Sequence, residues 1–484
     1  MRELRAAGMS ACVLLLCLAG CTVGPNYHRP AAATAPAWKE APPPNPPNGS
    51  WTQATPSDGA LRGAWWEMYG DAQLNALEDK VAVSNQTLRA AMEQYLQARE
   101  QVQVARSQYY PILSAGPSIE RTRESNNQPN TVKGVTTYQY NTFSLGGQAQ
   151  WEPDLWGQVR RTVEASRAGA QASAAELANV ELSLRAELAA DYFQLRGLDL
   201  QKQLLDNTVK SYREYLQLTE IRYHGGVATE SDVALAQTQL DTTRADDIDV
   251  GVARAQYEHA IATLIGVPAP EFDLPPAPLG GNPPAIPAGV PSQLLERRPD
   301  IAAAERQVDA ANAQIGIAMS AYYPNISLNG TGGMLSGSVG ALIQGPSEMW
   351  SLGASATELL FDAGRRHALT AQARDAYLQQ VANYRQTVLS AFQDVEDNLS
   401  ALQILDQESA AQAEAVNDAQ RSLTISTQQY KGGVATYLQV LTAQTAQLTS
   451  ERAQANVATE QFVASVQLIR ALGGGWNTSQ LPKL

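Results

Sequence analysis

The side chains best able to do covalent or metal chemistry in this sequence are three cysteines and four histidines. All three cysteines lie within the first 21 residues, at Cys12, Cys17 and Cys21. The rest of the chain therefore has no thiol for an internal disulfide or a thiolate metal site. The histidines form no i, i+4 ligand pair, and the sequence has no Gly-rich phosphate loop or nucleophile elbow. This pattern disfavours an enzyme, and we expect neither a catalytic nor a metal site.

Cys21 has a chemistry of its own because of the segment before it. Arg2 and Arg5 form a charged start, residues 11–19 are apolar, and Leu-Ala-Gly leads directly into the cysteine. This apolar stretch is too short for a bilayer, which takes about 20 residues, and it fits a secretory signal. The end of the segment resembles the bacterial lipobox, so we expect residues 1–20 to be a signal peptide and Cys21 to carry a covalent lipid such as palmitate. An ordinary signal peptide with an incidental cysteine is the alternative.

Charge and sorting signals favour an exported protein without a nucleic-acid partner. The net charge is −13, and it becomes −14 once the signal peptide is removed. An acidic chain lacks the basic surface that phosphate binding requires. Threonine, not aspartate, follows Cys21, which by resemblance to bacterial sorting rules favours the outer membrane. No later stretch holds 18 consecutive apolar residues, so a membrane crossing would have to use strands in a closed barrel.

An internal duplication organises the rest of the chain. Residues 223–238 and 430–445 share ten identities in sixteen positions, at an offset of 207. A Tyr-Tyr-Pro motif at 109–111 recurs at 322–324, an offset of 213, so the first copy is six residues longer between these anchors. An exposed loop tolerates such a difference best. The predicted parts are a signal peptide 1–20, a lipidated extended arm 21–64, a first repeat 65–266, a Pro/Gly-rich linker 267–299, a second repeat 300–473 and a C-terminal tail 474–484.

Each copy is expected to begin with a helix, over about 71–109 and 300–321. Asp300 is a candidate N-cap for the second helix. The Tyr-Tyr-Pro motif ends both helices, because proline restricts the residue before it.

Strands are expected after each of these helices. Apolar and polar residues alternate over 143–151 in copy one and over 325–329 and 350–357 in copy two, with Trp151 and Trp350 at strand ends. A soluble antiparallel sheet with one wet face is the alternative to membrane strands. Four strands cannot close a barrel, whereas three chains would supply twelve.

A very long helix follows each pair of strands, over 156–223 and 363–430. Nearly seventy residues would span roughly 100 Å. Each long helix stops at Gly-Gly and a second helix begins soon after, so each copy is expected to end in a helical hairpin.

The hairpin turns carry identifiable capping signals. Gly225 and Gly432 are expected to take the left-handed C-cap conformation. Thr436 with Gln439 forms a capping-box pattern, and Thr229 with Asp232 approximates one. Capping does not explain the apolar Val227 and Val434 at an exposed tip, which indicate a partner or a closed constriction.

In combination these features resemble the TolC-like outer-membrane efflux proteins, and most of all their lipoprotein branch, the NodT family. The resemblance covers almost the whole mature chain. It rests on the segments Cys21-Thr-Val-Gly-Pro-Asn-Tyr27, Trp151-Glu-Pro-Asp-Leu-Trp-Gly157, Arg297-Arg-Pro-Asp-Ile301, Ala321-Tyr-Tyr-Pro324, both Gly-Gly-Val-Ala-Thr turns and Ala471-Leu-Gly-Gly-Gly-Trp476.

The resemblance implies a mainly α fold with a membrane β-barrel. A duplicated helix–strand–strand–long helix–helix unit would form a homotrimer with a twelve-stranded barrel and a periplasmic α-helical barrel. Such a protein is a passive channel that exports drugs or other small molecules. An inner-membrane RND transporter supplies energy, a periplasmic adaptor (membrane fusion protein) docks on the hairpin tips, and the linker 267–299 forms part of an equatorial belt.

The resemblance also assigns roles to the two tips. The second tip narrows into the entrance gate, where Val434 and Leu438 match the apolar positions. Relatives place an acid and a base further along, where this chain has Thr442 and Thr445, so an apolar gate is predicted. The residues expected at the adaptor-docking tips are Gly225, Gly226, Val227 and Thr229 in copy one, and Gly432, Gly433 and Thr436 in copy two.

Two other functions fit parts of the sequence. A protein-secretion channel would share the architecture, although the lipobox and the Gly-Pro-Asn-Tyr segment favour small-molecule efflux. A trimeric adhesive stalk would have a single coil and a surface passenger in place of duplicated units. The sequence does not identify the substrates, the pump and adaptor, or the open or closed resting state.

Overall fold

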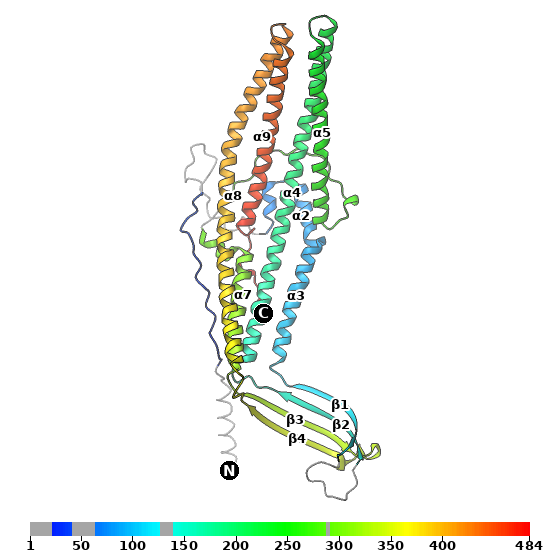
Figure 1. The fold of residues 1–484 in the computed structure, drawn as a ribbon, viewed down its shortest axis with the longest axis vertical. Helices are drawn as coiled ribbons and strands as arrows, with labels where there is room; N and C mark the ends of the chain where they lie inside the picture. The colour runs from blue at the N-terminus through cyan, green and yellow to red at the C-terminus, as the bar shows by residue number, and fades with distance from the viewer. Residues whose placement is uncertain (1–21, 41–62, 126–138, 287–290) are drawn as a thin grey trace.

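The computed structural model describes residues 22–40, 63–125, 139–286 and 291–484. Long helices form a narrow rod, and a four-stranded sheet projects from one end of it (Figure 1). Within these described residues, no helix combines the length and the apolar composition needed to cross a bilayer. The signal peptide and Cys21 lie outside the described residues.

The two copies share the order of helical segment, two strands, long helix and second helix, although the helical segment of copy one is divided. The elements of copy one are η1 (Trp65–Tyr69), α2 (Ala72–Ser84), α3 (Gln86–Ser107), β1 (Ile112–Arg123), β2 (Gln139–Trp151), α4 (Gln158–His224) and α5 (Glu230–Leu264). Those of copy two are α7 (Pro299–Ser320), β3 (Asn325–Ser336), β4 (Glu348–Thr357), α8 (Arg365–Lys431) and α9 (Tyr437–Ala471). Short helical turns and α6 (Leu294–Arg297) lie between and after these elements.

The first helix of copy one is interrupted, contrary to our expectation of one helix over 71–109. Asn85 separates α2 from α3 with an extended backbone. Its side-chain oxygen accepts a hydrogen bond from the Leu88 N–H (2.8 Å), and its amide donates to the Leu264 carbonyl (2.7 Å). The amide therefore caps α3 and fastens the break to the end of α5, which outweighs continuation of the helix.

Asp300 is not the N-cap of α7, so that prediction is also wrong. Pro299 takes the first helical position and Arg298 is the capping residue. The Asp300 carboxylate instead pairs with the Arg298 guanidinium, with 2.6 Å between Oδ2 and Nη2. Proline suits this position because its missing N–H has no helical partner there.

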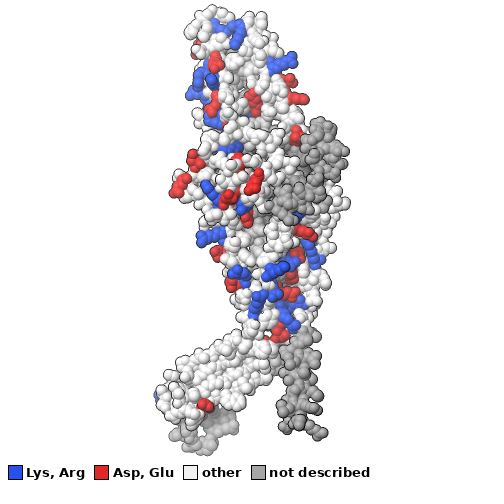
Figure 2. Space-filling model, turned by 180° about the vertical axis from the view of Figure 1, so that it is seen from behind, with Lys and Arg blue, Asp and Glu red and all other residues white. Residues whose placement is uncertain are grey.

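The four strands form one antiparallel sheet in the order β1-β2-β3-β4. One face is apolar, with Leu113, Leu145 and Leu352 among its exposed side chains, and the other carries serine pairs such as Ser118 with Ser144 (2.7 Å between hydroxyls). Charged residues in the strands are confined to Glu120, Arg121, Arg123 and Glu348. These four lie toward the end of the sheet farther from the helices, so the rest of the sheet in Figure 2 is almost free of charge.

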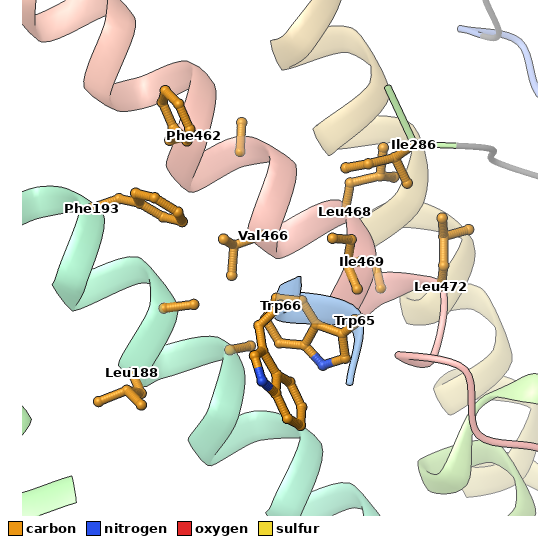
Figure 3. Close-up of a cluster of buried hydrophobic side chains, with 14 of the residues drawn as sticks. Trp65, Trp66, Leu188, Phe193, Ile286, Phe462, Val466, Leu468, Ile469 and Leu472 are labelled. Carbon is orange, nitrogen blue, oxygen red and sulfur yellow. The ribbon is translucent and has the colours of Figure 1, made fainter. Parts of the chain in front are cut away.

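The largest hydrophobic core lies midway along the rod, where short segments cross the long helices. Trp65 and Trp66 of η1 insert between α4 and α9 beside Leu188 and Val466 (Figure 3). Phe193 and Phe462 pack against each other with their ring centroids 4.7 Å apart. Burial of these side chains stabilises the middle of the rod.

The described part of the N-terminal arm, residues 22–40, runs along the rod without regular secondary structure. The Val23 N–H donates to the Trp156 carbonyl (3.1 Å), and the buried Arg161 donates to the Val23 and Gly24 carbonyls (3.2 Å each). Further along, the Glu396 carboxylate accepts the backbone N–H groups of residues 39 and 40. The arm is thus held at both of its described ends.

Candidate functional site at the helical hairpin tips

Two helical hairpins form the end of the rod opposite the sheet (Figure 1). The α4–α5 turn and the α8–α9 turn have the same backbone hydrogen bonds. The Val227 N–H donates to the Arg222 carbonyl (2.8 Å), and the Val434 N–H donates to the Gln429 carbonyl (3.0 Å). These bonds satisfy carbonyls that each long helix leaves free at its end.

The second glycine of each pair makes the turn, so the prediction for Gly225 and Gly432 is wrong. Both have right-handed helical backbones, with φ near −77° and −76°. Gly226 and Gly433 take the left-handed conformation, with φ of 73° and 77°. A Cβ strains this conformation, so glycine is required at the second position of each pair.

The two tips differ in how their second helix begins. Thr229 and Asp232 form a complete capping box: the Thr229 hydroxyl accepts the Asp232 N–H (3.2 Å), and the carboxylate accepts the Thr229 N–H (2.9 Å). The Thr436 side chain makes no capping hydrogen bond, so the predicted Thr436–Gln439 box is absent. The copy that only approximates the sequence pattern is therefore the one with the capping box.

Apolar side chains project from both tips into solvent. Val227 is 66% exposed, Val434 81% and Leu438 57%. Thr442 and Thr445 donate their hydroxyls to carbonyls of their own helix, those of Leu438 (2.9 Å) and Leu441 (3.0 Å). The second tip thus presents apolar groups and hydroxyls satisfied within the helix.

A tyrosine cluster joins the two hairpins behind the tips, and sequence reasoning missed it. Tyr212 donates its hydroxyl to the Gln444 carbonyl (3.1 Å), while Tyr430 and Tyr437 pack edge to face at 5.7 Å. Burial raises the pKa of Tyr212 to about 12, so this tyrosine stays protonated. The sequence does place these tyrosines near the two turns. Their spacing alone does not show that they face one another across the hairpins.

Arg222 is a second contact between hairpins that the sequence did not reveal. Its guanidinium lies over the Tyr430 ring, 4.6 Å from the centroid, and donates to the Lys431 carbonyl (3.2 Å). A cation on an aromatic face contributes about 0.5–1 kcal/mol at exposed sites and more when desolvated. The end of α4 therefore holds the end of α8 within one chain.

Four charged side chains of copy one fasten the linker to α4 and α5. We call this set, Arg196, Asp199, Arg254 and Glu258, the linker clamp. Asp199 is buried and accepts Arg254 Nε (2.7 Å), Arg196 Nη1 (2.9 Å) and a linker N–H at residue 277 (2.9 Å).

The rest of the linker clamp binds backbone. Arg196 donates to the Pro275 carbonyl (2.8 Å), and Arg254 donates to the Leu274 carbonyl (2.5 Å). Glu258 accepts the Leu274 N–H (2.6 Å). Residues 274–277 therefore lie in a fixed place across copy one.

The family model and the individual relatives that match this sequence agree on one family. The model of the family described as "Outer membrane efflux protein" matches residues 77–267 and 290–474. The "Probable efflux pump outer membrane protein TtgC" of Pseudomonas putida is 31% identical over 97% of this chain and 95% of its own length. "Outer membrane protein OprJ" of Pseudomonas aeruginosa is 31% identical over 98% of this chain and 96% of its own.

Solved structures agree with these sequence relatives. The structure titled "Structural insights of the outer-membrane channel OprN" superposes with a TM-score of 0.86 at 29% identity, covering 94% of this chain and all of that one. The predicted TolC-like fold is confirmed. Because the family model spans both copies and the relatives align over nearly the whole length, this chain belongs to the outer membrane efflux protein family and is an outer-membrane efflux channel.

Proposed function

We propose that this protein is the passive outer-membrane channel of a tripartite efflux system and works as a homotrimer that exports drugs or other small molecules. The observation that carries the proposal is the sheet. Among the residues that the structure describes, β1 and β4 each have one neighbouring strand and one unpaired edge. Unpaired edges are a liability that closure removes. Three copies would join their edges into a closed ring of twelve strands with an apolar outside and a polar inside.

The lipid anchor proposed for Cys21 fits this arrangement. Thr22 lies against Gly157, where the sheet connects to α4. An acyl chain on the preceding residue would therefore start at the level where the strands leave the helices. The parts 1–20, 21–64, 65–266, 267–299, 300–473 and 474–484 keep their proposed roles as signal peptide, arm, first repeat, equatorial linker, second repeat and tail.

The hairpin tips are the proposed working end in the periplasm. An adaptor that bridges to an inner-membrane RND transporter would dock on Gly225, Gly226, Val227, Thr229, Gly432, Gly433 and Thr436. Val434 and Leu438 would close the entrance, since three copies bring three sets of exposed apolar side chains together. Contact between them removes apolar surface from water and favours the closed state.

Replacing Leu438 with serine tests the gate. We expect the variant to admit large antibiotics that the wild-type channel excludes, because a serine cannot restore the apolar contact. The measurement is the minimum inhibitory concentration of vancomycin in a strain whose own channel gene is deleted, together with resistance to an exported drug.

Val227→Ser is the matched control, because it makes a similar change at the first tip. Unchanged vancomycin sensitivity in Leu438→Ser would contradict the gate. Failure of the wild-type chain to restore export with any pump of the host would contradict the proposed function itself.

A further inference from the structure

The two edges of the sheet point to one defined junction between copies. We propose that β4 of one copy pairs with β1 of the next in the register that places Thr357 opposite Gly116 and Ser355 opposite Ser118. The inference rests on the proposed trimer but adds the residues that meet.

The first step is that the duplication extends to strand register. Ile112 lies opposite Gln150 in the first hairpin of strands. Adding the sequence offsets of 213 and 207 gives residues 325 and 357, and Asn325 does lie opposite Thr357 in the second. The two hairpins of strands are therefore the same unit in the same register.

The second step uses the junction between units that the chain already contains. β2 pairs with β3 so that Gln150 lies opposite Asn329 and Gln148 opposite Thr331. Applying the same offsets moves this junction to the free edges of β4 and β1. Gln150 becomes Thr357 and Asn329 becomes Gly116, while Gln148 becomes Ser355 and Thr331 becomes Ser118.

The faces of the two edges agree with this register. Ser355 and Ser118 both lie on the polar face, since each hydroxyl bonds another serine of its own hairpin. On the other face the register pairs Ala354 with Ile119 and Ala356 with Pro117. A slip of one residue would place polar side chains against apolar ones along the whole edge.

At one position where the junction within the chain differs from the junction between copies, both partners of the contact differ together. Within the chain, Asn325 donates to Glu152 (3.2 Å). The corresponding residues at the free edges are Ile112 and Leu359, which are 74% and at least half exposed in the single chain. An amide–carboxylate pair is thus replaced by an apolar pair, which favours contact between copies.

The far end of the junction is complementary in charge and shape. The register places Trp350, which is 78% exposed, opposite Arg123, where a guanidinium can lie on the indole. Glu348 then lies diagonally from the same arginine, within reach of a long side chain. On this face the end of β1 presents Arg121 and Arg123 and the end of β4 presents Glu348, so these side chains attract each other across the junction.

Cysteine crosslinking tests the register. Full-length protein with Ser118→Cys and Ser355→Cys is oxidised in outer-membrane vesicles and run on a non-reducing gel. We expect covalent trimers, because opposite residues in an antiparallel pair have Cα atoms about 4.5–5.5 Å apart, within disulfide range. Ser118→Cys with Gly353→Cys, a slip of two residues, should crosslink at least about tenfold less because diagonal pairs lie about 7–8 Å apart.

Controls separate this inference from the proposed function. Gln148→Cys with Thr331→Cys, opposite each other within one chain, confirms that oxidant reaches the sheet, and each single cysteine reports background from Cys21. Stronger crosslinking of the slipped pair would overturn the register, as would trimers in native mass spectrometry that neither pair crosslinks. A chain that stays monomeric and restores no export would instead refute the proposed function.

A pair of opposite charges introduced at Ile112 and Leu359 tests the same junction through the stability of the trimer. Ile112→Lys and Leu359→Glu should each lower the temperature at which the trimer dissociates in detergent, because each places one charge against an apolar partner. The double variant should recover part of the loss. If the double variant dissociates at a temperature no higher than the single variants do, the contact between residues 112 and 359 is contradicted.

Discussion

The α4–α5 and α8–α9 hairpins are built alike but anchored differently. Both have a helix of 67 residues followed by one of 35, joined by the same Gly-Gly turn. The first is fastened midway by the linker clamp and closed at its tip by a capping box. The second has neither, so equal length and sequence pattern do not give equal constraint.

The difference at the middle of the rod follows from single residues. Asp199 corresponds to Asp406 at the repeat offset, but Arg196 and Arg254 correspond to Gln403 and Gln461. Without the arginines, Asp406 remains exposed, whereas Asp199 is buried. Residues 274–277 of the linker are therefore fixed to copy one by charge-assisted hydrogen bonds, which are about twice as strong as neutral ones.

This contrast leaves the two tips with different restraint. A capping box begins α5 at the first tip, whereas α9 begins without a side-chain capping hydrogen bond at the second. A segment with fewer fixed contacts opens at lower free energy. We therefore expect the first turn of α9 to open more readily than the first turn of α5.

The largest effect should come from Asp199→Ala. The substitution leaves two arginines without their buried partner, and breaking such a pair costs about 3–5 kcal/mol. We expect a clear fall in thermal unfolding temperature and fast hydrogen exchange over residues 274–279. Asp406→Ala is the matched control, with a change within about 0.5 kcal/mol for an exposed site. Equal effects of the two substitutions would contradict the claim that the linker clamp stabilises copy one alone.

A pH-dependent effect should follow from Glu78, which supports copy one alone. Its carboxylate lies in α2 beside Arg185 of α4 (3.5 Å) and is fully buried. Burial raises its pKa from 4.5 to about 8, outweighing the attraction of Arg185. The folded chain thus binds more protons than the unfolded chain between about pH 4.5 and 8, and its stability falls as pH rises through that range.

Glu78→Gln removes the free-energy cost of ionising a buried carboxylate. We expect it to raise the unfolding temperature at pH 8 and to match wild type below about pH 4.5, with each unit of pKa shift equivalent to about 1.4 kcal/mol. Asp79→Asn, the adjacent acid on the same helix, serves as control. A constant difference between Glu78→Gln and wild type across this pH range would contradict the assignment.

The smallest effect should come from the tips. Thr229→Ala removes the capping box and should destabilise the first turn of α5 by about 1 kcal/mol. Thr436→Ala removes no capping bond and should leave α9 nearly unchanged. Hydrogen exchange over residues 229–233 and 436–440 measures both. Equal increases in exchange would show that the two tips are capped alike.

Much of the fold could be predicted from the sequence. The long helices begin and end within two residues of the predicted limits, and the alternating stretches at 143–151, 325–329 and 350–357 lie in strands. These features are local: they depend on periodicity, proline and glycine, which act within a few residues. The break at Asn85 was missed because a contact with Leu264, far away in sequence, decides it.

The candidate site was predicted less completely. Both tips lie where the repeated Gly-Gly motif placed them, but the assignment of the turn to the first glycine was wrong. A Gly-Gly pair has the same composition in either register, and hydrogen bonding of the folded turn selects Gly226 and Gly433. The gate and docking roles of these residues stay predictions.

The sequence by itself determined a duplicated chain of long helices and alternating strands with hairpin tips, because such patterns follow from the intrinsic geometry of helix and strand. Only the tertiary structure decided that copy one holds residues 274–277 of the linker, and how the hairpins touch. Asp199 meets Arg254 where α5 packs back on α4, and Arg222 of α4 meets Tyr430 of α8 across the two hairpins. Such contacts depend on which helix faces meet, so identical motifs acquired different anchors in the two copies.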